Sequence, residues 1–110
     1  MDAPNTSYGT PLQVAARWAD VDLTRLLIAK GVNVNAVSGY GETALHTAAA
    51  HGEKAIAEIL IAHGANVNAL TTEGQTPLDF AYRGRDPDSG VVQLLTGAGG
   101  QEGRALRKGR

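Results

Sequence analysis

Apolar residues recur along the chain with helical spacing, in three pairs of segments. In the first segment of each pair they stand at i, i+3 and i+4: Leu12, Ala15 and Ala16; Leu45, Ala48 and Ala49; Leu78, Ala81 and Tyr82. The second segments repeat this spacing: Leu23, Leu26 and Leu27; Ile56, Ile59 and Leu60; Val91, Leu94 and Leu95. Such spacing puts the apolar residues on one helical face. The pattern predicts six short helices in three pairs, each helix burying one face.

A threonine precedes each first helix at a fixed period. Thr10, Thr43 and Thr76 stand 33 residues apart. A threonine side chain can cap a helix N-terminus by accepting a hydrogen bond from a backbone amide. Pro11 and Pro77 follow two of them, and proline suits the first helical position. We therefore expect the first helices to begin directly after these threonines.

A glycine follows the second helix in two of the pairs. Gly31 and Gly64 open the segments GVNVNA (31–36) and GANVNA (64–69), which are also 33 residues apart. Glycine ends helices well because it adopts the left-handed conformation without penalty. The connecting segments beyond are rich in Asn, Gly, Ser and Thr, which favours tight turns. A period of this length predicts a solenoid of stacked units.

The repeated unit resembles the ankyrin repeat. The middle unit matches the family pattern at Gly41, Thr43, Leu45, His46, Ala48, Ala49, Gly52, Leu60, Gly64, Ala65, Val67, Asn68 and Ala69. The resemblance implies an all-α ankyrin-repeat solenoid of three helix-turn-helix units with β-turn or hairpin-like connecting loops. On this basis we expect an N-terminal extension (1–7), three repeats (8–40, 41–73 and 74–100) and a basic flexible tail (101–110).

The first and third units depart from the family pattern. Gln13 and Asp79 replace the usual His, and Ala19 replaces a Gly. The third unit has two extra residues in RGRDPDSG (83–90), and we expect its second helix to end early, in TGAGG (96–100). Terminal repeats are commonly atypical because one side faces water. We therefore interpret the third unit as a divergent C-terminal cap.

Composition excludes some kinds of chemical site, and the charge distribution bears on the class of partner. The 110 residues suffice for one small domain, and cysteine is absent, which excludes disulfides and thiolate metal sites. Residues 1–100 carry six Lys/Arg against ten Asp/Glu, a net −4, whereas residues 101–110 carry four against one, a net +3. The acidic body argues against nucleic-acid binding. The basic tail could touch an acidic partner or RNA, or could simply be a solvated terminus.

Two kinds of segment bear on where the protein is located: a signal peptide and a membrane span. MDAPNTSYGTP has neither a basic region nor an apolar run, so we expect no signal peptide. No stretch approaches the length of a membrane span. These features predict a cytoplasmic protein without membrane contact.

Two motifs invite an enzymatic interpretation. GYGETA (39–44) fits the G-x-G-x-x-A spacing of a dinucleotide-binding turn, but that motif needs a strand–helix–strand unit, and two short helices follow here. His46 and His51 would point about 140° apart on a helix, so they cannot share a metal. In the ankyrin family the position of His46 uses its imidazole to bind neighbouring backbone and join adjacent turns.

The acidic residues do not indicate a catalytic site or a calcium site either. Asp20 and Asp22 lie in an expected interhelical turn without a visible partner. Asp86–Gly90 is faintly like a calcium loop, but the position that should carry Glu is Gly97. We therefore predict that the chain is not an enzyme and carries no cofactor and no metal.

The resemblance instead implies a binding face made of the turn tips and the first helices. Transferred by position, the face comprises Arg17, Trp18, Val37, Tyr40, Glu42, His51, Leu70, Glu73, Gln75 and Arg83. Aromatic residues and Arg dominate binding hot spots, which favours Tyr40 as a contact residue. Trp18 has two interpretations: a hot spot, or a cover for the open end of the first repeat.

The predicted function is therefore recognition of another protein. We expect a non-catalytic module that binds a partner protein on its concave ankyrin face and is monomeric on its own. The alternative is a regulatory or inhibitory subunit of a partner enzyme, similar to an antitoxin or a chaperone. The two hypotheses share a surface and differ in what binding does to the partner.

Overall fold

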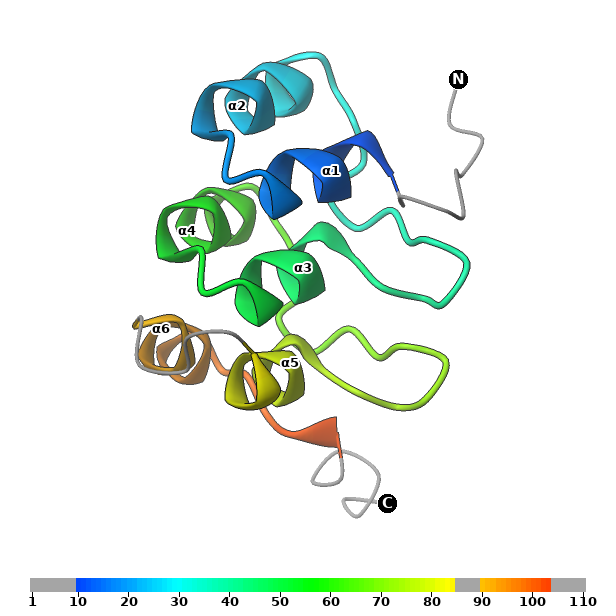
Figure 1. Ribbon diagram of the computed structural model, residues 1–110, viewed down its shortest axis with the longest axis vertical. Helices are drawn as coiled ribbons and strands as arrows, with labels where there is room; N and C mark the ends of the chain where they lie inside the picture. The colour runs from blue at the N-terminus through cyan, green and yellow to red at the C-terminus, as the bar shows by residue number, and fades with distance from the viewer. Residues whose placement is uncertain (1–9, 85–89, 104–110) are drawn as a thin grey trace.

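The computed structural model describes residues 10–84 and 90–103. Within these ranges the chain forms six helices and no strand: α1 (Pro11–Arg17), α2 (Val21–Ala29), α3 (Ala44–Ala50), α4 (Lys54–Ala62), α5 (Pro77–Arg83) and α6 (Val91–Gly97). Figure 1 shows them as three stacked helix pairs, with two long loops that project from the same side. The predicted all-α solenoid of three helix-turn-helix units is confirmed.

The first helix of each pair begins after its threonine, as predicted. Thr10, Thr43 and Thr76 each accept a hydrogen bond from the backbone amide three residues on, and that third residue's side chain accepts one from the threonine amide. This reciprocal arrangement satisfies two amide groups that a helix start would otherwise leave without partners. Gly31 and Gly64 have φ values of 88° and 95°, so the left-handed helix ends are also confirmed.

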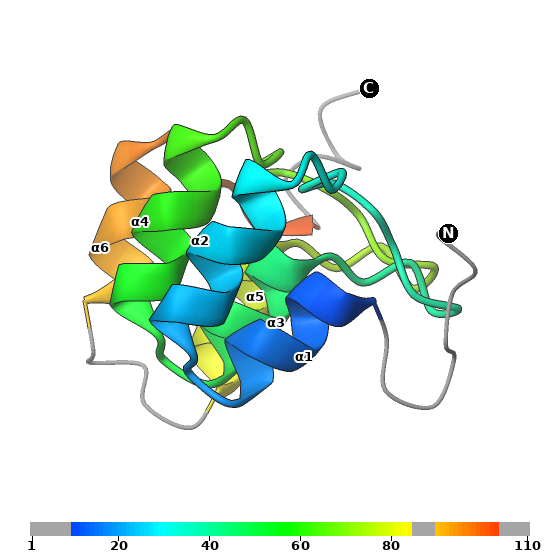
Figure 2. The same cartoon turned by 90° about the horizontal axis from the view of Figure 1, so that it is seen from above.

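The helices form two layers. The inner layer, α1, α3 and α5, stacks in order, and the outer layer, α2, α4 and α6, stacks behind it (Figure 2). The core between the layers is aliphatic and rich in alanine: Leu12, Ala16, Ala44, Leu45, Ala48, Ala49, Ile56, Ala57, Leu60, Leu78, Ala81, Val91 and Leu95. Small alanine side chains let neighbouring inner helices approach closely, which is why so few aromatic residues are needed.

Each long loop ends in a hairpin-like finger, which confirms the predicted loop shape. In the first finger (38–42) the Ser38 amide donates to the Glu42 carbonyl, 3.0 Å away. In the second (71–75) the Thr71 amide donates to the Gln75 carbonyl at the same distance. The Thr72 amide donates to the Tyr40 carbonyl, also at 3.0 Å, and so joins the two fingers. The fingers therefore form one continuous platform beside the inner helices.

Two expectations from the sequence need correction in the helix pairs, and one substitution is explained. Leu26 and Tyr82, placed on buried stripes, are 51% and 49% exposed, because α2 has no described helix pair before it and α5 has none after it. Asp20 is not without a partner, since its side chain accepts from the Leu23 amide and caps α2. Ala19 has a φ of 57°, the left-handed conformation that Gly52 supplies at the equivalent position of the second repeat.

The sixth helix is shortened at its start, not at its end. It ends at Gly97, followed by Ala98 and a left-handed Gly99, just as α4 ends at Ala62 before His63 and Gly64. The difference of 35 residues equals the period plus the two extra residues. The helix thus ends within TGAGG, as predicted, but this end is not early. Helix α6 is instead two residues shorter than α4 at its start, where Gly90 takes the N-cap position beside the inserted loop. Residues 85–89 of that loop, with the calcium-like Asp86 and Asp88, lie outside the described residues.

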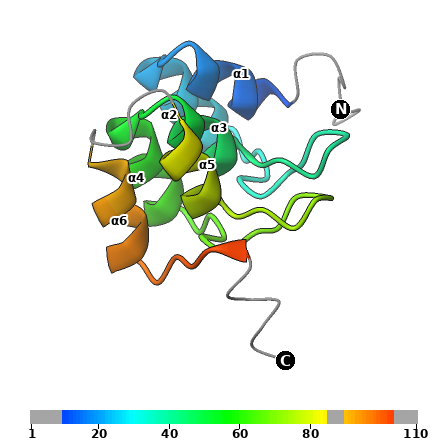
Figure 3. The same cartoon turned by 60° about the horizontal axis from the view of Figure 1, so that its bottom comes forward.

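Residues 99–103 are hydrogen-bonded to the second and third repeats. The Asn68 side chain donates to the Gly99 carbonyl and accepts from the Gln101 amide, as Asn35 does with Gly64 and Asn66. The segment runs from α6 back past α5 (Figure 3). The first part of the segment expected as a flexible tail is thus hydrogen-bonded to the third repeat. The exact repeat boundaries stay a prediction.

A glycine substitution tests how closely the repeats stack. A Cβ at Gly84 would lie 2.5 Å from the Ala50 carbonyl oxygen and 2.9 Å from that of Phe80. We expect Gly84→Ala to lower the free energy of unfolding by about 1 to 3 kcal/mol, because backbone on both sides would have to shift. The measurement is urea denaturation followed by circular dichroism.

Gly97→Ala is the matched control for this substitution. A Cβ there meets nothing within 4 Å, and alanine favours the helical conformation, so stability should be unchanged or slightly higher. Equal stability of the two variants would show that the third repeat is not held against Ala50.

Candidate binding face

Two equivalent side chains, Gln13 in α1 and His46 in α3, hold the fingers of the platform. The Gln13 side chain accepts from the Thr10 amide and donates to the Glu42 carbonyl, at the base of the first finger. His46 does the same between the Thr43 amide and the Gln75 carbonyl, both 3.0 Å away. Helices α1 and α3 therefore each fix one finger to their own N-terminus.

Asp79 occupies the equivalent position in the third repeat and makes different hydrogen bonds. A carboxylate can only accept hydrogen bonds, so it cannot bind the carbonyl that Gln13 and His46 bind. Its Oδ2 instead accepts from two amides, those of Thr76 (3.0 Å) and Gly103 (2.8 Å). Asp in place of His thus suits the third repeat, where the partner is the Gly103 amide and not the carbonyl of a finger.

His46 is neutral in this arrangement. The Thr43 amide can only donate, so Nδ1 is the acceptor, and the Gln75 carbonyl can only accept, so Nε2 carries the hydrogen. The ring is buried and meets the Phe80 ring edge to face, with centroids 4.9 Å apart. Burial lowers the pKa of His46, and the backbone hydrogen bonds to Gln75 and Ala69 and the nearby Asp79 carboxylate oppose this only partly. The predicted structural role of His46 is confirmed.

The lowered pKa of His46 predicts a pH-dependent stability. Because the pKa is lower in the folded chain, the unfolded chain takes up the proton first as the pH falls. The contribution of His46 to stability is complete above about pH 6.5, the ordinary pKa of an unfolded His, and is lost progressively below it. We expect His46→Gln to flatten the decline in unfolding free energy between neutral pH and about pH 5.

The measurement is a series of urea titrations across this pH range. Glutamine should preserve the fold, since Gln13 makes the same pair of bonds in the first repeat. His63→Gln, at an exposed position at the end of α4, is the matched control. A profile unchanged by His46→Gln would contradict the assignment.

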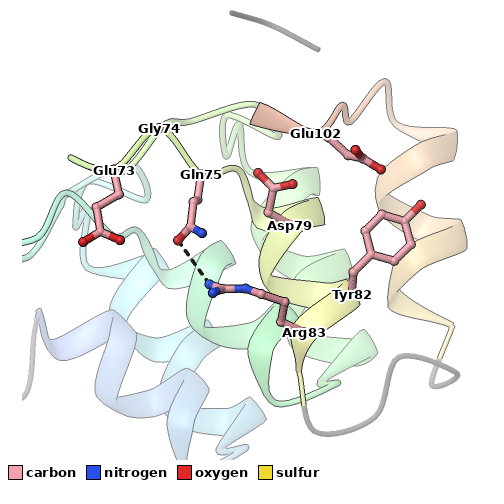
Figure 4. A pocket seen from close by; sticks show the side chains of 7 residues that line it. All are labelled: Glu73, Gly74, Gln75, Asp79, Tyr82, Arg83 and Glu102. Carbon is pink, nitrogen blue, oxygen red and sulfur yellow. Dashed lines mark hydrogen bonds between the residues drawn. The ribbon is translucent and has the colours of Figure 1, made fainter. Parts of the chain in front are cut away.

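Two hollows lie between the fingers and the inner helices. The larger, about 300 Å³, is lined by Glu73, Gly74, Gln75, Asp79, Tyr82, Arg83 and Glu102. Figure 4 shows their side chains converging from the second finger, α5 and the C-terminal segment. The smaller, about 90 Å³, lies between the fingers and is lined by Tyr40, Glu42, Thr71, Thr72, Glu73, Gln75 and Phe80. Glu73 and Gln75 border both hollows, so the two form one continuous surface.

Arg83 is the cation of this surface and is held by two contacts. One of its guanidinium nitrogens donates to Gln75 Oε1 at 3.1 Å (Figure 4). Its guanidinium carbon lies 5.4 Å from the centre of the Phe80 ring, within the range of a cation–π contact. The carboxylates of Glu73, Asp79 and Glu102 border the same hollow. The surface therefore offers both charges and an aromatic wall, which suits polar recognition of a peptide.

The structure brings together half of the residues expected on the binding face. Tyr40, Glu42, Glu73, Gln75 and Arg83 border the hollows. The other five do not: Val37 and Leu70 are exposed just before the fingers, and Arg17, Trp18 and His51 lie at the C-terminal ends of α1 and α3, away from the fingers. Whether any of the ten contacts a partner stays a prediction.

Seven residues that line the hollows are not among the ten: Thr71, Thr72, Gly74, Asp79, Phe80, Tyr82 and Glu102. Tyr82 was assigned to the buried stripe because it occupies the position of Ala16 and Ala49. The signal in the sequence was the size of the Tyr82 side chain. A tyrosine in place of the alanine fits only where no further helix pair packs against that position. No signal in the sequence placed Glu102 beside α5.

Metal-binding clusters and membrane-spanning helices are not found among residues 10–84 and 90–103. No group of three or more His, Cys, Asp or Glu among them could hold a metal ion. None of the six helices is long and apolar enough to cross a membrane. The dinucleotide-like glycines 39 and 41 belong to the first finger, which leads into a short helix pair and not a strand–helix–strand unit.

Stacked helix pairs with linked fingers define a repeat solenoid. The family model described as ankyrin repeats, three copies, matches residues 12–103, and the chain belongs to this family. A comparison with curated proteins gives no match. Ankyrin repeats are in general protein–protein interaction modules and are typically non-catalytic.

Proposed function

We propose that the chain binds a partner protein on the concave face formed by the two fingers and the inner helices. The observation that carries the proposal is Tyr40, a tyrosine that is 68% exposed on a finger fixed by backbone hydrogen bonds. Such an aromatic side chain gains contact area at little cost in conformational entropy. The two hollows beside it supply the polar contacts that would set orientation.

The charges around Tyr40 favour a partner segment that is itself polar. Glu42 and Glu73 lie on the two fingers, and Arg83 borders the larger hollow with Glu73 and donates to Gln75. Charged groups at the edge of an interface affect association rate and specificity more than affinity. We therefore assign the main share of affinity to Tyr40 and the selection of partner to these charges.

Substitution of Tyr40 tests the proposal. A partner is first captured from the native host with the full chain and identified, and its affinity is then measured by calorimetry. We expect Tyr40→Ala to weaken binding by about tenfold or more, equivalent to about 1.4 kcal/mol. Since Tyr40 is exposed, the thermal midpoint should not change.

Glu58→Ala is the matched control, since Glu58 is exposed on α4, in the outer layer away from the fingers. It should bind as the parent does. Equal binding by Tyr40→Ala and the parent would show that the fingers are not the binding site. Assay of the captured partner, with and without the chain, separates simple binding from a regulatory or inhibitory role.

A further inference from the structure

The charged side chains of the described residues are unevenly distributed. Those that border the two hollows are four carboxylates and one guanidinium, a net charge of −3: Glu42, Glu73, Asp79, Glu102 and Arg83. The other charged residues of 10–84 and 90–103 are four basic and four acidic ones, whose charges cancel: Arg17, Arg25, Lys30, Lys54, Asp20, Asp22, Glu53 and Glu58. The net negative charge of the described chain therefore lies around the hollows.

The carboxylates of the larger hollow come from separate elements and meet only in the folded chain. Glu73 belongs to the second finger, Asp79 to α5 and Glu102 to the C-terminal segment (Figure 4). With Arg83, these residues give the hollow a net charge of −2. A recess lined mainly by one sign of charge concentrates the electrostatic field and attracts groups of the opposite sign. The larger hollow therefore favours a cationic group of a partner.

An aromatic side chain favours a guanidinium among the possible cations. Tyr82 is 49% exposed and borders the same hollow. A guanidinium is planar, so it can stack on an aromatic ring and can donate two parallel hydrogen bonds to a carboxylate. The chain already holds one guanidinium in a related way, since Arg83 lies over the Phe80 ring and donates to Gln75. Tyr82 and the nearby carboxylates offer an incoming arginine the same kinds of contact.

We propose that the partner segment is basic and places an arginine side chain in the larger hollow, against Tyr82 and among the carboxylates. The inference rests on the proposed function, because it names the chemistry of the partner at the same face. Glu73 borders both hollows, so a segment that contacts Tyr40 at the smaller hollow can reach the larger one. An acidic segment would bring like charges together, which disfavours such a partner.

The chain itself contains a second source of basic side chains. Residues 104–110 carry four of them, and they follow Gly103, whose amide donates to Asp79 at the hollow. A full-length variant with these four residues replaced by glutamine therefore belongs in the experiment. It shows whether the chain's own basic residues compete with a partner for the hollow.

Titration with a small arginine peptide tests the proposal. The probe is acetyl-Gly-Arg-Gly-amide, and its control carries citrulline, the uncharged counterpart of arginine with nearly the same shape. Binding to the isotope-labelled full chain is followed by NMR at low ionic strength, where charge attraction is least screened. We expect the arginine peptide to shift the amide signals of Glu73, Gln75 and Tyr82 to saturation at millimolar concentration. The citrulline peptide should bind about fivefold more weakly, or less.

Single substitutions locate the contact. Glu73→Gln removes one carboxylate of the hollow and should weaken binding of the arginine peptide about two- to fivefold, the size expected of an exposed charge pair. Tyr82→Leu removes the ring and should weaken binding by a similar factor. Glu58→Gln, at an exposed position of α4 away from the fingers, is the matched control and should bind as the parent does. Circular dichroism checks that each variant is folded.

Three results would overturn the proposal. The first is equal binding, or no binding, of the arginine and citrulline peptides by the parent. The second is equal affinity of Glu73→Gln and Glu58→Gln for the arginine peptide. The third is binding by the 104–110 variant but not by the parent, which would assign the hollow to the chain's own basic residues. The Tyr40→Ala test is separate, because it measures affinity for the captured partner and changes no residue of the larger hollow.

Discussion

Leu45→Ala is expected to lower the free energy of unfolding by about 2 to 5 kcal/mol. Leu45 is fully buried in α3, the middle inner helix, which packs on both α1 and α5. Its loss would open a cavity in the core cluster, where the closely packed alanines leave little room for collapse. A domain of this size has a total stability of about 5 to 15 kcal/mol, so the variant loses a large share of it.

Urea denaturation of the parent and the variant, followed by circular dichroism, measures this loss. Leu70→Ala is the matched control, because it removes the same atoms from a half-exposed side chain beside the second finger. We expect it to change stability by less than about 0.5 kcal/mol. If the two leucine variants were equally stable, Leu45 could not be the centre of a shared core.

His46→Leu is expected to cost about 2 to 4 kcal/mol, although leucine is a good core residue. The substitution removes the partners of two buried backbone groups, the Thr43 amide and the Gln75 carbonyl. A buried group without a hydrogen-bond partner costs about 1 to 3 kcal/mol. The variant should also loosen the second finger, since Gln75 ends that hairpin.

Denaturation of His46→Leu and His46→Gln at pH 8 separates hydrogen bonding from size. At that pH His46 is neutral in both the folded and the unfolded chain, so protonation plays no part. Glutamine can make both bonds, as Gln13 does, and should retain most of the stability. Amide exchange at Thr71 and Thr72 would report the loosened finger. A leucine variant as stable as the glutamine variant would mean that the two backbone groups do not depend on residue 46.

Features that depend on neighbouring residues in the chain could be predicted. Thr43 and its equivalents begin helices because a cap needs only the amides of the next turn. Gly64 ends one because a left-handed conformation is a property of the single residue. The role of His46 followed from the family resemblance, and the structure supplied its partner, Gln75.

Features that depend on the neighbouring repeat could not be predicted. Leu26 and Ile59 occupy equivalent positions and have similar side chains, but one is exposed and the other is buried. Tyr82 and Ala49 likewise share a position and differ in surroundings. The position of Arg83 over Phe80, within reach of Gln75, depends on how the second finger folds back over α5.

The sequence by itself determined the repeat, the helix pairs, their caps and the family, because these depend on short-range spacing that recurs every 33 residues. Only the tertiary structure decided which residues meet at the two hollows and how Asp79 replaces a histidine. These depend on how the fingers and residues 99–103 fold back onto the inner helices, and such contacts join residues that the short-range pattern does not relate.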